Sequence, residues 1–262
     1  MKRLLESARS VARQLTPPVL AQFVRRLGQT PESSELVESR RRVDADEYVN
    51  WLCMVVGGWL SPGAGNLAAF DHAIRHMPAG GAVVEIGSFL GLSTNILAYL
   101  LIKYARPNTL FTADPWTFEG TDKPLSGYFD GSTDAYRRYA KDVFKLNASL
   151  FSANRLPFTV EAPSDRFFEL WDAGAHAEDV FGRTTRLGGG ISFAYIDGAH
   201  TYEAARADFF NVDRHLLPGG YVLLDDTSDE CPFDSRRVIP EILQHPVYRL
   251  VFKTPHYFFR KS

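Results

Sequence analysis

The chain has 262 residues and a mass of 29.4 kDa, with 45% hydrophobic and 23% charged residues. This length and apolar content fit one large or two small globular domains, and they exclude a chain that is disordered, collagen-like or coiled coil throughout. The 29 Lys and Arg residues nearly balance the 31 Asp and Glu residues, which gives a net charge of −2. Because the chain has no overall basic field, nucleic acid is not an expected partner.

Cysteine usage and hydropathy favour a cytoplasmic protein. Cys53 and Cys231 lie far apart with no CxxC spacing, so we expect neither a disulfide framework nor a cysteine zinc site. The basic N-terminus leads into an amphipathic pattern broken by Pro17 and Pro18, which does not match a secretory signal. The longest uncharged run, residues 86–102, is shorter than the roughly 20 apolar residues of a membrane span and is polar in its first half.

The first 28 residues carry six basic residues against one acidic residue, a net charge of +5. Apolar residues recur there at helical spacing, and Thr16 followed by Pro17 is typical of the start of a second helix. Two interpretations stay open. The helices pack on the protein body or on a second subunit, as in a homo-oligomer, or they form a peripheral anchor on anionic lipid at the inner face of the membrane. We assign residues 1–46 to these helices and a charged linker, and residues 47–79 to helical cover. The charged part, residues 29–46, could be a solvated linker or the surface of a helix.

From residue 80 onward, short β-branched or aromatic runs alternate with helical stretches. This rhythm predicts a parallel sheet with crossover helices. The last two runs, 248–252 and 256–260, are too close for a crossover and predict an antiparallel hairpin. We therefore expect residues 80–262 to form a Rossmann-like, doubly wound α/β domain with a seven-stranded, mostly parallel sheet. The other five strands are expected at residues 82–86, 110–113, 158–161, 193–196 and 221–224.

A glycine turn follows the first expected strand, in the sequence Glu85-Ile86-Gly87-Ser88-Phe89-Leu90-Gly91-Leu92-Ser93. Such turns hold a ligand close to backbone N–H groups. The turn is not a P-loop, because no Lys-Ser/Thr pair follows Gly91, and it lacks the GxGxxG spacing of dinucleotide-binding proteins. Asp114 ends the second strand, where a carboxylate suits ribose hydroxyls. The alternative for Asp114 is an Asx turn, since Asp-Pro also favours turns.

Three further carboxylates are expected at the same edge of the sheet. Asp197 ends the fourth strand, and Asp225 with Asp226 ends the fifth. Because the carboxyl ends of parallel strands meet at one edge, these groups would repel one another. A hard divalent cation with oxygen ligands, Mg²⁺ by default, relieves that repulsion and leaves positions for substrate hydroxyls. The alternative is that the carboxylates cap helices and form turns.

His200 lies three residues after Asp197, at the start of the next expected helix. Three roles stay open for its imidazole. It could act as a general base near neutral pH, donate a hydrogen bond at the helix start, or bind a metal.

Together these segments resemble class I S-adenosylmethionine (SAM) methyltransferases. The resemblance is to bacterial metal-dependent small-molecule and sugar O-methyltransferases of methyltransferase family 24, such as the macrocin and aminocoumarin sugar enzymes. It covers roughly residues 80–262 and depends on an ordered set of segments. These are residues 85–93, 114–116, 196–203 and 217–226.

The resemblance implies roles for individual residues. Glu85, Gly87 and Ser93 would surround the methionine part of SAM, and Asp114 would bind the ribose hydroxyls. The remaining expected cofactor contacts are Ser88, Gly91, Trp116 and Ser164. Asp197, Asp225 and Asp226 match the magnesium ligands of the family. Either His200 or Asp197 would take the proton of the acceptor, although related catechol enzymes often have lysine at the position of His200.

The expected reaction is direct transfer of a methyl group from SAM to a hydroxyl of a sugar or another small molecule, such as a glycan or natural product. Residues 118–156 could cover the site as a lid or form ordinary helical cover. Two other functions compete with this one. A noncatalytic SAM-binding or scaffold protein would keep the motifs without turnover. A nicotinamide-dependent oxidoreductase would share the sheet but is disfavoured by the missing GxGxxG.

Overall fold

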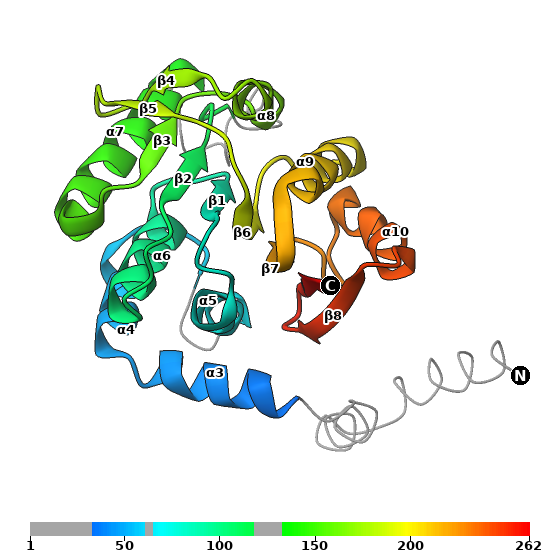
Figure 1. Cartoon of the computed structure of the whole chain (residues 1–262). Helices are drawn as coiled ribbons and strands as arrows, with labels where there is room; N and C mark the ends of the chain where they lie inside the picture. The colour runs from blue at the N-terminus through cyan, green and yellow to red at the C-terminus, as the bar shows by residue number, and fades with distance from the viewer. Residues whose placement is uncertain (1–32, 61–64, 118–132) are drawn as a thin grey trace, which may run out of the picture. The chain divides into compact units, whose positions relative to one another are not determined.

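The computed structural model describes residues 33–60, 65–117 and 133–262 (Figure 1). The chain divides into a unit of residues 1–34 and a unit of residues 35–262, and the fold below is that of the second unit. The basic segment 1–28, with its expected membrane contact, and the first part of the expected lid lie outside the described residues. None of the described helices combines the length and the hydropathy needed to cross a membrane.

Three helices precede the sheet: α3 (Ser34–Asp44), α4 (Glu47–Val55) and α5 (Gly65–His76). The charged stretch around residue 40 forms a helix rather than an open linker, because Leu36 and Val43 lie on one face of α3 and are buried. Asp46 caps α4 by accepting hydrogen bonds from two backbone N–H groups of its first turn. Three short helices, of which α4 has a side-chain cap, therefore lead the chain to the first strand.

The main sheet has seven strands in the order β3-β2-β1-β6-β7-β9-β8. Its strands are β1 (Ala82–Ile86), β2 (Leu110–Ala113), β3 (Phe158–Val160), β6 (Ile191–Ile196), β7 (Leu216–Leu224), β8 (Tyr248–Lys253) and β9 (Tyr257–Lys261). The first five in that order pair in parallel, and β9 runs antiparallel to both of its neighbours. The doubly wound sheet with an antiparallel C-terminal hairpin is thus confirmed.

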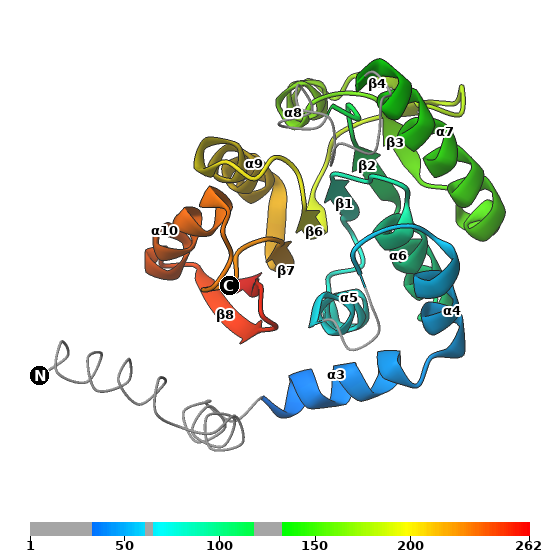
Figure 2. The ribbon, with the colours of Figure 1, turned by 180° about the vertical axis from the view of Figure 1, so that it is seen from behind.

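Helices cover both faces of this sheet, as the two opposite views show (Figures 1 and 2). Alternate strand residues enter different cores because side chains of a strand point to opposite faces. Phe193 and Tyr195 of β6 pack with α4, α5 and α6, whereas Ala194 and Ile196 pack with α8, α9 and α10. All six residues of β6 are buried, so its continuous apolar run reflects burial on both sides.

The remaining helices follow the expected crossover pattern. They are α6 (Leu92–Lys103), α7 (Thr133–Phe151), α8 (Ser164–Asp172), α9 (Tyr202–His215) and α10 (Ile239–Gln244), with short 3-10 turns at Ala153–Arg155 and Asp234–Val238. The described part of the expected lid is the long helix α7, which packs on α6. A small antiparallel pair, β4 (His176–Glu178) with β5 (Thr184–Arg186), lies in a stretch where no strand was expected. Its strands are three residues each and half exposed, too short for a clear alternating pattern.

Candidate active site

The glycine turn after β1 is shaped by close contact with β6. Gly87 has φ of +86°, and a Cβ at this position would lie 1.9 Å from the carbonyl oxygen of Asp197. The backbone N–H of Asp197 also donates to the carbonyl of Ile86 at 2.8 Å. Only glycine satisfies both the positive φ and the close approach. The turn therefore brings the end of β1 directly against the first carboxylate of the expected cluster.

Asp114 fastens this turn to the end of β2. Its Oδ2 accepts hydrogen bonds from the N–H groups of Ser88 and Phe89, at 2.7 and 2.9 Å, and its Oδ1 accepts one from the N–H of Trp116 at 2.6 Å. Burial raises the pKa of Asp114, and these three backbone bonds oppose that rise. The Asx-turn bond is therefore formed, and the carboxylate also lines the cavity described below. Ribose binding by Asp114 stays a prediction.

Glu85 lies fully buried beneath the turn. The hydroxyl of Thr94 donates to its Oε2 at 2.5 Å, while Oε1 has no hydrogen-bond partner among the described residues. Burial is the main cause that raises the pKa of Glu85 to about 7. The carboxyl of Glu85 therefore keeps its proton up to about pH 7, whereas an exposed glutamate is ionised well below that pH.

Trp116 supports the turn from behind. Its indole N–H donates to the carbonyl of Phe89 at 2.9 Å, and the ring is fully buried beside Phe144.

Of the eight residues expected to contact the cofactor, three lie behind the cavity wall and five line it. Those behind are Glu85, Gly91 and Trp116, and those lining it are Gly87, Ser88, Ser93, Asp114 and Ser164.

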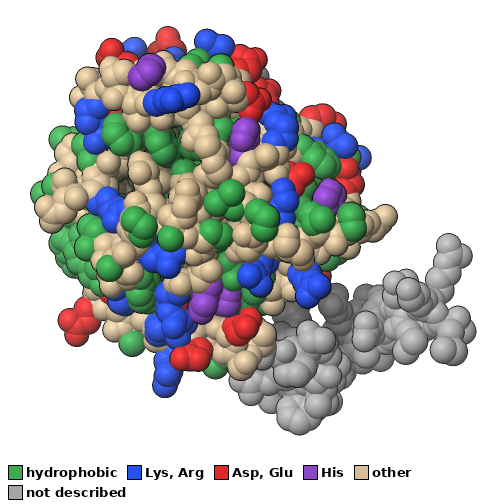
Figure 3. All heavy atoms as spheres, viewed as in Figure 1, with side chains coloured by type: hydrophobic (Ala, Val, Ile, Leu, Met, Phe, Trp, Pro, Cys, Tyr) green, Lys and Arg blue, Asp and Glu red, His purple; other side chains and the backbone are tan. Residues whose placement is uncertain are grey.

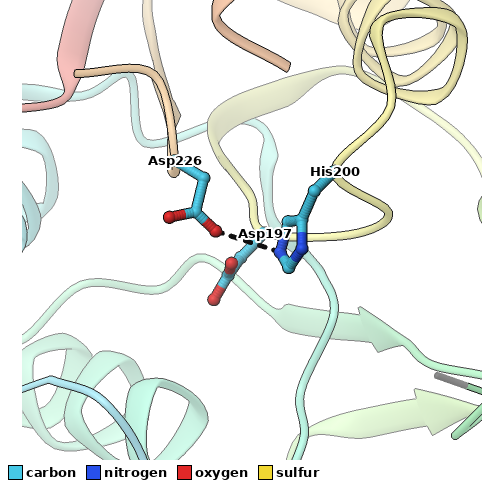
Figure 4. A group of neighbouring side chains, drawn as sticks. All are labelled: Asp197, His200 and Asp226. Carbon is cyan, nitrogen blue, oxygen red and sulfur yellow. Dashed lines mark ion pairs between the residues drawn. The ribbon is translucent and has the colours of Figure 1, made fainter. Parts of the chain in front are cut away.

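Asp197, His200 and Asp226 form a cluster at the carboxyl ends of β6 and β7 (Figure 4). Nε2 of His200 lies 3.0 Å from Oδ2 of Asp226, and the imidazole stacks on Phe233 at a centroid distance of 4.4 Å. Each of the three residues offers one ligand atom, and these atoms lie within 4.8 Å of one another. Asp226 reaches the cluster through a left-handed backbone, with φ of +49°. The arrangement can position an imidazole and can also surround a divalent cation.

Asp225 is engaged by other side chains, so its carboxylate faces a different set of partners from that of Asp226. Its Oδ2 accepts from the amide of Asn66 at 2.8 Å and from the hydroxyl of Tyr195. Its Oδ1 lies 3.0 Å from Nε2 of His256. Nδ1 of His256 accepts the backbone N–H of Thr227 at 3.1 Å, so Nε2 carries the proton that is donated to Asp225. A metal role for Asp225 stays a prediction.

The hydroxyl of Tyr195 lies between two carboxyls, those of Asp225 and Asp197, the latter at 3.0 Å. Burial by itself would raise the pKa of Asp225, but the hydrogen bonds from His256 and Tyr195 hold it below its usual value. Burial and the neighbouring charge of Asp225 raise the pKa of Asp197 well above its usual range. A phenol has one proton, so Tyr195 can donate to only one of these carboxyls at a time, and ionised Asp225 is the stronger acceptor.

A cavity of about 860 Å³ joins these groups. Its walls come from residues 57–60 and 65–66, the glycine turn, the carboxyl ends of β2, β6 and β7, and residues 254–256 of the C-terminal hairpin. The wall formed by residues 65–66 touches the wall formed by residues 254–256, because a Cβ on Gly65 would lie 1.7 Å from the carbonyl oxygen of Thr254. Ligand cavities usually measure roughly 300–1,000 Å³. The size suits a nucleoside-containing cofactor together with a second small molecule.

The lining residues that the sequence did not single out include Trp59, Asn66, Tyr195, Asp208 and His256. Trp59 is 88% exposed and stacks on Phe89 of the glycine turn, with ring centroids 5.2 Å apart. The only sequence signal for it is an aromatic residue after two glycines. The other four belong to a helix start, a strand, a helix and a hairpin turn that converge only in the folded chain.

Acidic and basic side chains are interspersed over the face of the described residues in Figure 3. That face offers no single-sign field of the kind that grips a phosphate backbone. A doubly wound sheet with a glycine turn, an acidic residue on the next strand and a cavity at the carboxyl edge is typical of proteins that bind a nucleoside-containing cofactor.

Comparison with known proteins gives the family. A protein-family model described as "Methyltransferase domain" matches residues 84–227, which is 144 of the 262 residues. No curated protein matches the chain. The chain belongs to this methyltransferase family, and it is a class I SAM-dependent methyltransferase.

Solved structures with similar folds include two of CalS11, described as a calicheamicin methyltransferase and as a TDP-rhamnose 3'-O-methyltransferase. The first is 18% identical, covers 88% of this chain and 94% of that one, and has a TM-score of 0.52. The second is 19% identical, covers 88% and 96%, and has a TM-score of 0.50. The O-methyltransferase NovP is 17% identical, covers 74% and 78%, and has a TM-score of 0.48. At these identities, the CalS11 structures show a common fold.

Proposed function

We propose that the protein transfers the methyl group of SAM to a hydroxyl oxygen of a small polar acceptor, with a sugar hydroxyl as the first candidate. The observation that carries this proposal is that one cavity contains both the glycine turn with Asp114 and the cluster of Asp197, His200 and Asp226. Methyl transfer requires the acceptor oxygen, the methyl carbon and the sulfur to lie in line, so the two ligands must meet in one cavity.

SAM fits the cofactor side of the cavity on the residues present. The turn exposes backbone and the Ser88 hydroxyl, a buried Oγ with no hydrogen-bond partner among the described residues. Buried polar atoms of this kind are normally satisfied, so a polar ligand at the turn would complete their bonding. When bound, SAM supplies a methyl group activated by the adjacent sulfonium. The chain supplies position and shields the reacting atoms from water.

The acceptor side has unsatisfied hydrogen-bonding groups. Asn66 must turn its NH₂ toward the carboxylate of Asp225, which can only accept, so its Oδ1 faces away. That Oδ1 and the hydroxyl oxygen of Thr254 are buried and have no partner among the described residues. Both residues line the cavity. An acceptor with several hydroxyl groups could bond to both, whereas an apolar acceptor would leave them unsatisfied.

Trp59 supports a ring-shaped acceptor. Its exposed aromatic face lies at the cavity, held in place by stacking on Phe89. Such a face offers a rigid surface with little loss of side-chain entropy when a sugar or aromatic ring packs on it. One of the structures of similar fold is described as a TDP-rhamnose 3'-O-methyltransferase, so nucleotide sugars are the first acceptors to test.

His200 is the base in this proposal. Its imidazole lines the cavity, and the contact with Asp226 and the stacking on Phe233 fix the direction of the ring. A positioned base of this kind contributes roughly 10²- to 10⁴-fold to rate. Asp197, the other expected base, is already bonded to Tyr195 and is therefore better placed to hold the cluster together.

Asp197, His200 and Asp226 also fit a divalent cation, since their ligand atoms converge within 4.8 Å. Two carboxylates suit Mg²⁺, whereas an imidazole is a more usual ligand of transition metals, so Asp197 and Asp226 would hold Mg²⁺ and leave the imidazole of His200 to act as the base. A bound cation would lower the pKa of an acceptor hydroxyl. Mg²⁺ dependence is therefore part of the proposal, and Mn²⁺ is the ion to compare with it.

The test is a methyl-transfer assay with labelled SAM and a panel of nucleotide sugars, glycosides and catechols, each with Mg²⁺, Mn²⁺ or a chelator. We expect label in at least one hydroxylated acceptor, with His200→Asn reducing the rate by about 100-fold. A matched control is His245→Asn, which changes a histidine outside the cavity. Methyl label that appears only on nitrogen or carbon atoms of the acceptors would contradict O-methylation. An unchanged rate of methyl transfer in the presence of the chelator would contradict the need for a cation.

A further inference from the structure

Two neighbouring helices, α4 and α7, expose large apolar side chains that do not line the cavity. Both helices pack on α6, and the ring of Trp51 on α4 meets the ring of Phe151 at the end of α7, with centroids 5.3 Å apart. We name this surface the α4–α7 face. Its apolar side chains are each between 43% and 75% exposed, and they are Trp51, Met54, Val55, Tyr139, Leu146 and Leu150.

The helix α7 has two apolar sides. Phe144 and Ala148 are buried on its inner side, beside the glycine turn. Tyr139, Leu146 and Leu150 follow one another at intervals of seven and four residues, so they form a single stripe on its outer side. A surface helix of a soluble protein normally buries one apolar stripe and presents polar residues opposite to it. The second, exposed stripe therefore indicates an interaction surface.

Basic charge accompanies this apolar stripe. Arg138 and Lys145 are seven residues apart and lie along the same side of it, with Asp142 between them. The whole of α7 has four basic and two acidic residues, a net charge of +2. Residues 1–28 have a net charge of +5, although the net charge of the complete chain is −2. Positive charge is thus concentrated in the N-terminal segment and on α7.

This charge decides which occupant suits the α4–α7 face. Residues 1–28, from the same chain or from a second copy, would bring a strongly basic segment against a basic helix. Two α4–α7 faces packed together would likewise oppose two basic helices, and like charges disfavour both arrangements. An anionic lipid surface attracts the basic residues and accepts Trp, Tyr, Leu and Met side chains at the boundary between headgroups and acyl chains.

We propose that the α4–α7 face docks on an anionic lipid bilayer, with its apolar side chains in the headgroup boundary and Arg138 and Lys145 against the anionic headgroups. Peripheral docking of this kind requires no membrane-spanning helix. The docking is a separate property from the proposed methyl transfer and does not depend on which acceptor is methylated.

The α4–α7 face lies next to the cavity. Trp59, which lines the cavity, comes four residues after the end of α4. Its ring stacks on Phe89, and Phe89 packs against the cluster that includes Phe144 and Ala148 of α7. Docking would therefore bring one wall of the cavity close to the lipid surface.

The first experiment is co-sedimentation of the full-length protein with vesicles of phosphatidylcholine alone or mixed with phosphatidylglycerol. We expect at least about 10-fold tighter binding to the mixed vesicles, since each basic residue near an anionic surface contributes about 5-fold to affinity. High salt should weaken this binding. Equal or absent binding to the two kinds of vesicle would overturn the proposal.

A double substitution, Leu146→Glu with Leu150→Glu, tests the face itself. It should weaken binding to the mixed vesicles by at least about 10-fold, because it places negative charge where apolar side chains meet the lipid. The matched control is Leu243→Glu with Leu250→Glu, which changes two exposed leucines on α10 and β8 and should keep wild-type binding. Wild-type binding by the first variant would overturn the assignment, since the attachment would then belong to another part of the chain.

Tryptophan fluorescence gives a second measurement that needs no charged variant. All four tryptophans lie among the described residues and none lies in residues 1–28, so quenching by vesicles with brominated acyl chains reports contact of the folded body with lipid. Trp51 and Trp59 are exposed, whereas the other two are buried. We expect quenching of the wild-type protein and a smaller quenched fraction in Trp51→Phe. Binding to vesicles without quenching would overturn docking through this face.

Sedimentation velocity without lipid separates lipid docking from self-association. Wild-type protein and the variant with Leu146→Glu and Leu150→Glu should have the same mass in solution. A wild-type oligomer that dissociates in this variant would overturn the proposal, because the α4–α7 face would then be an interface between copies of the chain.

Discussion

Replacing Glu85 by Gln should change how stability depends on pH. The buried carboxyl has its pKa raised from 4.5 to about 7, so the folded state holds a proton that the unfolded state releases between these values. Stability contributed by this group is therefore present at low pH and is lost as pH rises through about 7. A shift of this size corresponds to about 3 kcal/mol in total, and to about 2.5 kcal/mol between pH 5 and pH 8.

The assay is urea unfolding of the ligand-free protein, followed by tryptophan fluorescence, at several pH values from 5 to 8. We expect wild-type protein to lose about 2.5 kcal/mol more than Glu85→Gln over this range. Buried Asp208 also has a raised pKa, but it titrates in both proteins and its contribution cancels in the difference. The charge of Glu85 is one of the causes that raise the pKa of Asp197, so a change in the titration of Asp197 is part of the measured difference. Glu178→Gln, at an exposed position, should run parallel to wild type. Parallel curves for wild type and Glu85→Gln would refute the burial argument.

Three other substitutions test the walls of the cavity. Gly87→Ala forces a Cβ against the carbonyl of Asp197 at positive φ, so it should lower stability by about 2 kcal/mol and weaken binding of S-adenosylhomocysteine. The control is Gly80→Ala, where a Cβ meets nothing within 4 Å. Wild-type binding of S-adenosylhomocysteine by Gly87→Ala would contradict the contact. Trp59→Ala should raise KM for the acceptor up to about 10-fold with an unchanged Tm, whereas Trp51→Ala, outside the cavity, should leave KM alone. Asp226→Asn should lower kcat by about 100-fold, while its binding of S-adenosylhomocysteine stays within about 3-fold of wild type. A large loss of that binding would count against a role confined to the reacting atoms. The control is Asp234→Asn, which changes an exposed aspartate.

The sheet was predictable because its strands are short, buried on both faces and bounded by glycine or acidic residues. β1 and β2 begin and end at the expected residues. β7 starts five residues earlier than expected, at Leu216, because Pro218 and the two glycines after it are accommodated at a register shift between the first residues of β6 and β7. Hydrophobic periodicity cannot show such an irregularity, since it depends on the neighbouring strand.

The candidate site was predictable only where its residues follow strands. Strand ends locate Asp114, Asp197 and Asp226, because all parallel strands finish at one edge. The partners of Asp225 could not be found in this way, since Asn66 and His256 come from opposite ends of the chain and meet only through tertiary packing. Adjacent residues 225 and 226 look equivalent in sequence, yet the left-handed backbone at Asp226 sends their carboxylates to different partners.

The two walls that the proposal assigns to the acceptor, residues 57–60 with 65–66 and residues 254–256, both lie outside the stretch 84–227 that matches the family. On this proposal, the groups that bind the methyl donor and the catalytic cluster lie in one continuous segment, and the two remaining walls come from short segments before and after it. Substitutions, insertions or exchanges in those segments can alter which molecule is methylated while the methyl-donor machinery stays intact. Divergence of acceptor choice among proteins of this family is expected to concentrate there.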